Sequence, residues 1–372
     1  MIVHIFENIP HHYHNFMRFF VEYASHDSSG AVVSNNNSIM HKVYIPIDTN
    51  LETHNDNMAK MTLLDCEVCS YDGHKSLIKA LKAEDPNRQF IFHSMLSRRL
   101  WLELMLTSLP ARSHWVSWGG DLYQNIFVQA TFKQQVAKWV QALTCRRFAS
   151  VKSLNPGDGQ LIKQILGRKK VDTLPYPLVG VEVPTRLTET AKSPCTLLLG
   201  NSAAPSNNHF ELLAAVAHLK NKEIKVVMPL NYAGSQDYIA TVIKQGEQLF
   251  GDKFEPLLNM LTKQEYDQLL LAVDVAVFAH DRQQGLYVAY HMMLHGKKLF
   301  LKQSTTSYSN FIQYGFYVQS LSELASYDYS QLLVIEPQQQ RHNQQQMINT
   351  FTEQALGPQW FAFFSQLDGV VD

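Results

Sequence analysis

The chain is predicted to be an α/β protein with two domains, each a parallel β-sheet wrapped by helices. Strand-like and helix-like segments alternate in both halves, which is typical of parallel sheets with helical crossovers. A proline-rich passage between Val171 and Pro194 separates the halves and indicates a linker. The length of 372 residues also exceeds what one hydrophobic core usually serves, so two domains are expected.

The first half begins with an apolar strand and continues the alternation to about residue 151. Strands are expected at Ile2–Phe6, Lys42–Ile45, Met61–Cys66, Gln89–His93, His114–Trp118 and Arg147–Val151. Helices are expected at Asn15–Tyr23, Lys75–Ala83 and Ser97–Thr107. The polar stretches Asn35–Asn37 and Asn50–Asn57 are expected to form surface loops.

The second half repeats the pattern after the linker. Strands are expected at Cys195–Leu199 and Ile224–Met228, and helices at Asn208–Leu219, Gln236–Leu249 and Lys263–Ala272. After about Tyr327 the chain is rich in glutamine and then helical to its end. We therefore expect an N-terminal domain at 1–175, a C-terminal domain at 190–345, and a terminal helix at 346–372 that can pack back on the first domain.

Composition argues against several classes of function. The net charge of −1 and the pI near 7.0 offer no basic field for nucleic acid. No run approaches the roughly 20 apolar residues that span a bilayer. The N-terminus resembles a first strand and lacks the basic region of a signal peptide. Cys66 and Cys69 form a lone C-x-x-C without a second pair, which indicates ordinary thiols in a reducing cytoplasm and no metal site.

The most informative stretch runs from Asp274 to Leu301. It predicts a buried strand, a polar loop that ends at Gly285, a helix, and a second strand. Such a loop lies at the carboxyl end of a parallel strand, where open α/β sheets bind ligands. Gly285 allows a tight turn, and the free N–H groups of the following helix would face an anion.

An ordered set of segments resembles glycosyltransferase family 56. The matching segments are Ile9-Pro10-His11-His12, Arg18-Phe19-Phe20, Phe92-His93, Leu100-Trp101-Leu102, His114-Trp115, Trp118-Gly119-Gly120-Asp121-Leu122-Tyr123, Gly200-Asn201-Ser202, Ser206-Asn207, Lys225-Val226-Val227-Met228-Pro229 and Arg282-Gln283-Gln284-Gly285. They occur in family order between about Ile2 and Leu301. The chain departs from the family pattern after Gly285, where Leu286-Tyr287-Val288 replaces an apolar-Gly-Thr sequence, and Tyr287 is expected to fill space near the donor.

The resemblance implies a GT-B fold, in which two Rossmann-like domains face a central cleft. It implies inverting transfer of 4-acetamido-4,6-dideoxygalactose (Fuc4NAc) from dTDP to the lipid-linked saccharide (lipid II) of enterobacterial common antigen assembly. No metal or other cofactor is expected. The partners would be the dTDP-sugar, the lipid-linked acceptor and the membrane surface, and the location would be the cytoplasmic face of the inner membrane, by peripheral contact.

The donor would bind to the second domain. Arg282 matches a phosphate bidentately, although it is also interpretable as a solvated loop charge. Gln283, Gln284 and the Gly285 amide would face the phosphates. Nucleotide-sugar contacts are also expected from Gly200, Asn201, Ser202, Asn207 and Tyr232. For Asn207 a helix N-cap, and for Tyr232 an ordinary surface tyrosine, are equally good interpretations.

The general base is expected in the first domain. Asp121 follows two glycines after a strand and is the first candidate, with an N-cap role as the alternative. His93 ends a strand and is either the rival base or a buried, satisfied histidine. His11, His12 and Trp118 are assigned to the acceptor side. A solvated loop is the alternative for the two histidines, and adjacent histidines without a local carboxylate do not favour a metal site.

Two segments that combine basic and aromatic residues are candidates for contact with a membrane: Phe132–Leu143 and Ser97–Thr107. Interfacial binding fits their composition, but packing against the protein core is the favoured interpretation of Phe132–Leu143. Two other functions stay open. One is a sugar-nucleotide epimerase or hydrolase on the same scaffold, and the other is a nucleotide-sugar-binding protein without turnover. A two-lobed solute receptor would need an export signal, which the sequence does not show.

Overall fold

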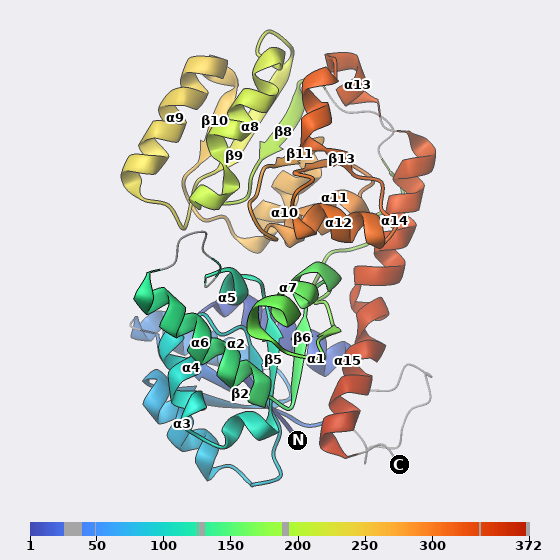
Figure 1. The fold of residues 1–372 in the computed structure, drawn as a ribbon. Coiled ribbons are helices and arrows are strands. Elements are labelled where there is room, and N and C mark those ends of the chain that lie inside the picture. Colours follow the sequence, from blue (N-terminus) through green and yellow to red (C-terminus); the bar gives the residue numbers. More distant parts are fainter. Residues whose placement is uncertain are drawn as a thin grey trace. The chain divides into compact units, whose positions relative to one another are not determined.

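The structure is a computed structural model that describes residues 1–25, 39–48, 50–124, 126, 131–187, 193–334 and 336–369. The expected loop at Asn35–Asn37 lies outside these residues. The chain forms two compact units (Figure 1). Unit 1 consists of Met1–Gly180 and Phe351–Asp372, and unit 2 consists of Val181–Thr350.

Unit 1 is built on a seven-stranded, all-parallel sheet with the strand order β3-β2-β1-β4-β5-β6-β7. The strands are β1 (Ile2–Phe6), β2 (His41–Pro46), β3 (Cys66–Tyr71), β4 (Phe90–His93), β5 (Ser113–Ser117), β6 (Ser150–Ser153) and β7 (Asp172–Thr173). The first three strands extend to one side of β1 and the other four to the opposite side. The order therefore reverses between β1 and β4, and a crevice at the carboxyl ends of such strands is where doubly wound sheets bind ligands.

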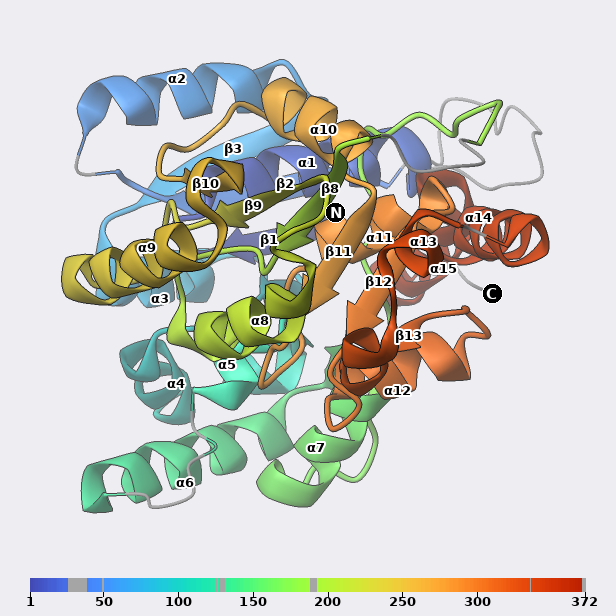
Figure 2. The ribbon, with the colours of Figure 1, turned by 90° about the horizontal axis from the view of Figure 1, so that it is seen from above.

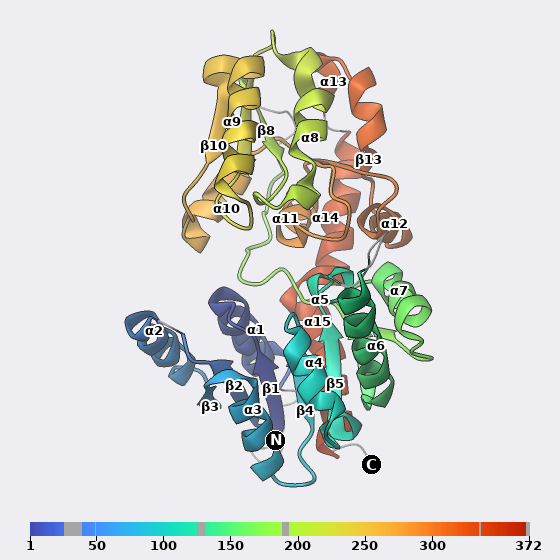
Figure 3. The ribbon, with the colours of Figure 1, turned by 60° about the vertical axis from the view of Figure 1, so that its left-hand side comes forward.

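Two helical layers cover this sheet. Unit 1 contains α1 (Pro10–Tyr23), α2 (Leu51–Thr62), α3 (Gly73–Ala83), α4 (Arg98–Met105), η1 (Leu109–Arg112), α5 (Gly120–Tyr123), α6 (Phe132–Arg147), α7 (Pro156–Leu166) and α15 (Glu353–Asp368). Helices α3, α4, α6 and α7 pack side by side (Figure 3). Helix α1 packs on α15, although most of the chain separates them in sequence (Figure 1).

Successive side chains of β1 point to opposite faces of the sheet, so each helical layer packs on a different set of residues. Val3 and Ile5 of β1 belong to the apolar cluster formed with α3, α4, α6 and α7. The residues between and after them, His4 and Phe6, point to the opposite face. There His4 stacks on Phe20 of α1, with ring centroids 5.1 Å apart, and meets Phe364 of α15 edge-on at 5.5 Å.

The core under α1 and α15 contains a continuous chain of buried histidines. The Nδ1 of His4 lies 2.9 Å from Nε2 of His93, and its Nε2 lies 2.9 Å from Nδ1 of His41. All three side chains are at most 3% exposed. Burial lowers the pKa of His4 and His93 well below the usual value, and lowers that of His41 to about 3, so all three are neutral near pH 7.

The hydrogen-bond partners at the two ends of this histidine chain determine which ring nitrogen of each histidine carries the proton. Ser25 donates its O–H to the Phe20 carbonyl at 2.8 Å, so its oxygen accepts from Nε2 of His41 at 2.9 Å. Each following histidine must then also carry its proton on Nε2. At the other end, Nδ1 of His93 accepts the hydroxyl proton of Tyr176.

One predicted strand of unit 1 is wrong. A strand was expected at Met61–Cys66 and a loop at Asn50–Asn57, but α2 covers Leu51–Thr62 and β3 begins only at Cys66. The Asn50 side chain caps this helix, accepting from the backbone N–H of Glu52 at 3.0 Å and of Thr53 at 3.3 Å. The polar composition that predicts a loop thus belongs to an exposed, N-capped helix.

Unit 2 is built on a six-stranded parallel sheet with the order β10-β9-β8-β11-β12-β13. The strands are β8 (Cys195–Leu199), β9 (Ile224–Pro229), β10 (Phe254–Leu257), β11 (Val275–Phe278), β12 (Lys298–Leu301) and β13 (Gln319–Ser320). The order reverses between β8 and β11, so unit 2 has its own ligand-binding edge.

The helices of unit 2 also form two layers. They are η2 (Pro205–Asn207), α8 (His209–Val216), η3 (Ala217–Leu219), α9 (Gln236–Phe250), η4 (Gly251–Lys253), α10 (Lys263–Ala272), α11 (Leu286–Leu294), α12 (Thr306–Gln313), η5 (Leu321–Ser326), α13 (Tyr329–Leu333) and α14 (Pro337–Phe351). Helix α8 packs on α9, and α10 packs on α11 (Figure 2). Within the described ranges, no helix of either unit has the length and hydropathy required to cross a bilayer.

Acid is expected to destabilise unit 1, because the folded state keeps His4, His41 and His93 neutral. The pKa of a histidine in an unfolded chain is about 6.5. The lowered pKa values of these three histidines therefore cost no stability above about pH 6.5, and the free energy of unfolding decreases as the pH falls below that value. Below that pH, uptake of at least three protons on unfolding makes the free energy of unfolding fall by about 4 kcal/mol or more per pH unit, since the pKa of the buried His114 is lowered as well.

The measurement is urea unfolding followed by tryptophan fluorescence, from about pH 7.5 to about pH 5.5. The signal is specific, because all five tryptophans (Trp101, Trp115, Trp118, Trp139 and Trp360) belong to unit 1. An unfolding midpoint that stays constant over this range would contradict the prediction.

Candidate functional site

The candidate ligand-binding edge of unit 2 consists of the loops that follow β8 and β11. The backbone N–H of Gly200 donates to the Val277 carbonyl at 3.0 Å, which joins the two strands at the point where they end. Gly200 has φ +72°, and a Cβ there would lie 2.7 Å from Oδ1 of Asn207. The first loop can therefore turn back on itself only with glycine at this position.

Asn207 holds the two loops together. Its Oδ1 accepts from the Asn201 backbone N–H and from Nε2 of His280, each at 2.9 Å. Its Nδ2 donates to Oγ of Ser202 and to the Ala204 carbonyl, each at 3.1 Å. The side chain is fully buried, and every donor and acceptor that it has is used.

Both interpretations of Asn207 from sequence are therefore wrong. It has no hydrogen-bonding capacity left for a nucleotide, and the N-cap of α8 is its neighbour Asn208. Asn208 has φ +54° and donates through Nδ2 to the Ala279 carbonyl and to Oδ1 of Asp281, each at 2.7 Å. Adjacent asparagines thus brace the loop after β8 against the loop after β11.

Three predicted ligand contacts do come together at this edge. Nε2 of Gln284 donates to Oδ1 of Asn201 at 3.2 Å, and Nδ2 of Asn201 donates to the Tyr232 hydroxyl at 3.3 Å. Ser206 donates to Oε1 of Gln284 at 2.9 Å. Tyr232 is 48% exposed, so its ring is accessible for stacking. Ser202 is buried beside Asn207 and contributes to the loop from within.

The start of α11 provides an anion-binding geometry. Gly285 is the N-cap of this helix and has φ +70°; a Cβ there would lie 3.1 Å from the rings of Phe278 and His280. The first N–H groups of α11 have no partner within the helix and carry its positive dipole end. Tyr287, expected to fill space near a donor, instead donates its hydroxyl proton to Asp267 of α10.

The side chains just before Gly285 add charge and an unsatisfied acceptor. Arg282 donates to the Gln283 carbonyl at 3.2 Å. Burial, aided by the Arg282 charge, lowers the pKa of His280 to about 3, so His280 is neutral and Arg282 supplies the positive charge. Gln283 is 3% exposed, and its Oε1 is buried without a hydrogen-bond partner among the described residues. Such an oxygen requires a hydrogen-bond donor, which water or a ligand can supply.

In unit 1, Asp121 organises the loops that follow β4 and β5. Oδ2 accepts from the Met95 backbone N–H at 3.0 Å and from Nε1 of Trp115 at 2.8 Å. Oδ1 accepts from the Ser117 hydroxyl at 2.9 Å and from the Trp118 backbone N–H at 3.0 Å. The side chain is fully buried.

Neither role expected for Asp121 fits this environment. Both oxygens already accept two hydrogen bonds and no surface is exposed, so the carboxylate cannot reach an incoming hydroxyl as a base. It is not an N-cap either, because Gly119, with φ +87°, precedes the short helix α5. Burial raises the pKa of Asp121, although its four hydrogen-bond donors act in the opposite direction.

His93 is also not placed as a base. Its Nε2 donates to His4 and its Nδ1 accepts from Tyr176, so both ring nitrogens are engaged in the buried histidine chain. The alternative interpretation from sequence, a buried and satisfied histidine, describes what the structure contains.

Of the three residues predicted on the acceptor side, the structure describes the side chains of His12 and Trp118, which lie close together. The rings of His12 and Trp118 lie 4.8 Å apart, and Phe16 meets both. The side chain of His11 lies outside the described part of the chain. Within the described ranges, no three His, Cys, Asp or Glu side chains are grouped as metal ligands.

One candidate residue was missed in the sequence. Glu7 directly follows β1 and is partly buried, with Oε1 accepting from the Ser97 backbone N–H at 3.1 Å. Burial raises the pKa of its carboxyl, against the backbone N–H groups of Ser97 and Leu96, and the charge of Asp121 raises it further. The position of Glu7 directly after the first strand could have identified it, because that strand is one of the two between which the strand order reverses.

The predicted packing of Phe132–Leu143 against the core holds for one face of α6 only. Val140 and Ala142 are buried in the core of unit 1, whereas Phe132, Val136 and Trp139 are 79%, 43% and 59% exposed. Their spacing of four and three residues puts them on one face of the helix. Lys133 and Lys138 are exposed beside them. This apolar stripe of α6 is therefore bordered by positive charge.

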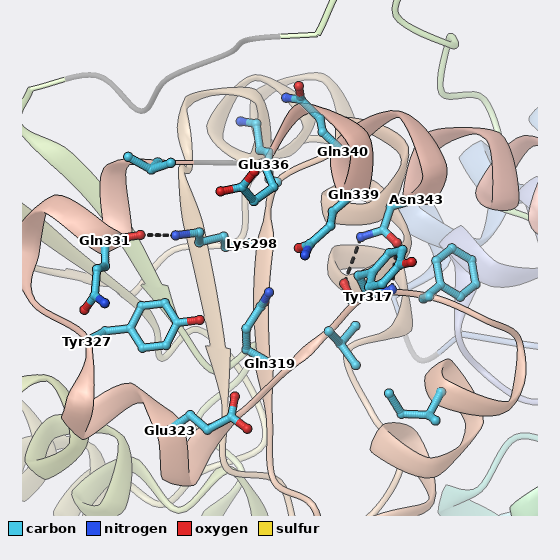
Figure 4. A pocket seen from close by; sticks show the side chains of 16 residues that line it. Lys298, Tyr317, Gln319, Glu323, Tyr327, Gln331, Glu336, Gln339, Gln340 and Asn343 are labelled. Atoms are coloured by element: carbon cyan, nitrogen blue, oxygen red, sulfur yellow. Dashed lines mark hydrogen bonds between the residues drawn. The ribbon is translucent and has the colours of Figure 1, made fainter.

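Unit 2 also contains a pocket of about 520 Å³ with polar and apolar side chains in its lining (Figure 4). Lys298 and Gln319 of the strands, Tyr317 and Tyr327, and Gln339 and Asn343 of α14 contribute to its lining. Lys298 opens β12, whereas the loops described above follow the carboxyl ends of β8 and β11. The pocket therefore belongs to the other edge of the sheet and is separate from the candidate site.

Comparisons with known proteins agree with this arrangement. The family model described as 4-alpha-L-fucosyltransferase, glycosyl transferase group 56, matches residues 1–366. Among solved structures, the OtsA apo structure aligns with a TM-score of 0.66 at 10% identity, covering 100% of both chains. Anabaena HepE in complex with UDP-glucose aligns with a TM-score of 0.65 at 13% identity, covering 98% of this chain and 100% of that one.

A third solved structure is similar over its whole length. Sucrose-phosphate synthase from Thermosynechococcus elongatus aligns with a TM-score of 0.63 at 12% identity, covering 100% of both chains. At this level of identity the likeness concerns the fold, which is the GT-B fold of glycosyltransferases.

Substitution of Asp121 by asparagine is expected to destabilise unit 1 by about 3 kcal/mol, because the amide leaves buried donors without an acceptor. Urea unfolding followed by tryptophan fluorescence gives the value. Glu103→Gln is the matched control, since Glu103 is 25% exposed in an i,i+4 pair with Arg99. A stable Asp121→Asn protein that has lost only its activity would show that the carboxylate acts in chemistry after all.

Proposed function

The chain belongs to glycosyltransferase group 56, and on that basis we propose that it transfers Fuc4NAc from dTDP to a polyprenyl-diphosphate-linked oligosaccharide, with inversion at the anomeric carbon. The family match and the GT-B fold make it a glycosyltransferase. The proposal adds the donor sugar, the lipid acceptor and a role in enterobacterial common antigen assembly. The observation that carries the donor site is the loop before α11, which combines Arg282, an unsatisfied Gln283 and a Gly285 N-cap.

This loop is suited to a departing nucleoside diphosphate. The first N–H groups of α11 and the Arg282 guanidinium would stabilise the charge that develops on the leaving diphosphate. Gln284 and Asn201 already hydrogen bond to each other and would present amide groups from both loops. Tyr232, exposed beside Asn201, would stack on the base. These side chains account for diphosphate binding without a metal ion, and we propose that none is needed.

The lipid-linked acceptor requires contact with a membrane surface. The apolar stripe of α6, with Phe132, Val136 and Trp139 exposed beside Lys133 and Lys138, has the composition of an interfacial helix. We propose peripheral binding through this stripe at the cytoplasmic face of the inner membrane. The acceptor saccharide would meet unit 1 near His12 and Trp118.

Nucleotide binding tests the proposed function first. Thermal unfolding is measured with dTDP, UDP, GDP and ADP, each with and without Mg²⁺. A ligand at 100 times its dissociation constant stabilises the fold by about 2.7 kcal/mol, so a clear upward shift with dTDP in the absence of metal is expected. No shift with any nucleotide would contradict the proposed donor site.

Turnover distinguishes the remaining alternatives. Transfer of sugar from dTDP-Fuc4NAc to the lipid-linked acceptor is expected. Consumption of the dTDP-sugar at an equal rate without acceptor would indicate an epimerase or hydrolase, and binding without turnover would indicate a non-catalytic protein.

Arg282→Ala is expected to weaken dTDP binding by about 10- to 100-fold, because charge-assisted hydrogen bonds contribute about 1.5–3 kcal/mol. Titration calorimetry at two salt concentrations measures the effect, and the difference from wild type should shrink at high salt. Arg341→Ala, an exposed arginine on α14, is the control. Equal affinities for the Arg282→Ala and wild-type proteins would remove Arg282 from the site.

Replacing Phe132 and Trp139 by serine is expected to weaken binding to vesicles of phosphatidylglycerol and phosphatidylcholine by about tenfold or more, since each inserted apolar side chain contributes about 2 kcal/mol. Cosedimentation measures the bound fraction. Met260→Ser, an exposed apolar residue of unit 2, is the control and should bind like wild type. Unchanged binding of the double variant would show that membrane contact, if present, uses another surface.

A further inference from the structure

The carboxylates at or near the carboxyl edge of the unit 1 sheet include Glu7, Asp48 and Asp121. Asp121 is fully buried and holds four donors. Asp48 follows β2, one strand away from the reversal of strand order. Glu7 follows β1, and β1 and β4 are the two strands between which the order reverses. Position alone therefore distinguishes Glu7 from the other two carboxylates.

The loop after β4 fixes the Glu7 side chain. Ser94 directly follows that strand and has φ +67°, a conformation that few residues other than glycine adopt. This turn directs the following backbone so that the Ser97 N–H donates to Oε1 of Glu7 at 3.1 Å. Met95 in the same loop is held by Asp121 at 3.0 Å. The buried Asp121 thus stabilises the loop that positions Glu7.

The charge around Glu7 suits proton acceptance. Within the described ranges, the neighbouring charge that acts on its pKa is the carboxylate of Asp121, and no cation forms an ion pair with it. A carboxylate without a countercharge, and partly withdrawn from water, is more basic than an exposed one. Its partial exposure leaves it accessible, whereas Asp121 and His93 are fully buried.

We propose that Glu7 is the general base of the transfer reaction. The acceptor O–H bond breaks and its proton passes to the Glu7 carboxylate, while the acceptor oxygen forms a bond to the anomeric carbon. The bond from that carbon to the diphosphate breaks, and its electron pair leaves with dTDP. The inference rests on the proposed function, since the substrate hydroxyl is that of the sugar acceptor.

Asp48 is the nearest rival. It already shapes its own loop, because Oδ1 accepts from the Asn50 backbone N–H at 3.0 Å and Oδ2 accepts from Nδ2 of Asn8 at 3.4 Å. Both oxygens of Asp48 thus hold its own loop, and Asp48 follows β2 and not one of the two strands between which the order reverses. Glu7 keeps its backbone anchor on one oxygen while the carboxylate reacts.

The test compares Glu7→Gln, Asp48→Asn and Glu103→Gln with the wild-type enzyme. Transfer by the wild type and its affinity for dTDP are measured first, and these two results decide the proposed function. For Glu7→Gln, kcat/KM is expected to fall by about 10²- to 10⁴-fold, while dTDP affinity and tryptophan-monitored stability stay at wild-type values. Glu103→Gln should retain wild-type activity.

The pH profile separates catalysis from a structural role. In the wild type, kcat/KM should decline below the pKa of Glu7, because the protonated carboxyl cannot accept the proton. Glu7→Asp keeps a carboxylate, shortened by one methylene, and should retain this acid limb at a lower rate. Glu7→Gln should lack it. Fluorescence at each pH confirms that unit 1 is still folded.

Two outcomes would overturn the inference. One is a Glu7→Gln enzyme with kcat/KM within about threefold of wild type and an intact acid limb. The other is loss of the acid limb in Asp48→Asn while Glu7→Gln retains it. If Glu7→Gln does not fold, Glu7→Asp decides, because a wild-type rate with an acid limb at the wild-type pH in that variant would also exclude Glu7.

Discussion

The reversal of strand order within a parallel sheet is the constraint on which both candidate sites depend. Parallel strands all end on one edge, so each loop that follows a strand is brought to the same side of the unit. Where the order reverses, two such loops diverge and leave room for a ligand. In unit 2 these are the loops after β8 and β11, and in unit 1 those after β1 and β4. Asn207 then fixes the two loops of unit 2, and Asp121 fixes the loops after β4 and β5 of unit 1, each by using all of its hydrogen-bonding capacity.

Unit 1 stabilises the polar groups in its interior by two different means. Asp121 is a buried carboxylate that four donors compensate, whereas the histidine chain of unit 1 is neutral throughout. A neutral chain avoids the cost of burying charge, but it fixes one tautomer for each ring. The direction set by Ser25 is transmitted to Tyr176 through three imidazoles. The histidines therefore determine a unique core arrangement under α1 and α15.

Much of the fold was predictable from sequence, because apolar strands and capped helices have strong local signals. The predicted limits of β1, β8 and α10 agree with the structure. The strand expected at Met61–Cys66 failed, because a single asparagine cap makes a helix of a polar segment. The short strand β10 was not predicted, since its four residues include a glutamate and a proline.

The sequence predicted which loops form the candidate site better than it predicted the role of each residue in them. The segments around Gly200 and Gly285 carry the glycines that their turns require. A sequence does not show whether an asparagine or aspartate binds a ligand or stabilises a loop. Burial of the side chain distinguishes the two roles, and burial depends on contacts with residues distant in sequence. Asn207 and Asp121 were misassigned for that reason. The exposure of Phe132 and Trp139 likewise depends on which face of α6 packs on α4 and α7.

The return of α15 to unit 1 has a consequence for synthesis on the ribosome. Trp360 and Phe364 complete the core around His4 and Phe20, yet they are translated after all of unit 2. Unit 2 is one continuous segment and can close its core as it emerges, whereas unit 1 must wait with the part of one sheet face that α15 covers still exposed. During that interval the exposed strand face is the part of the nascent chain that most needs a chaperone.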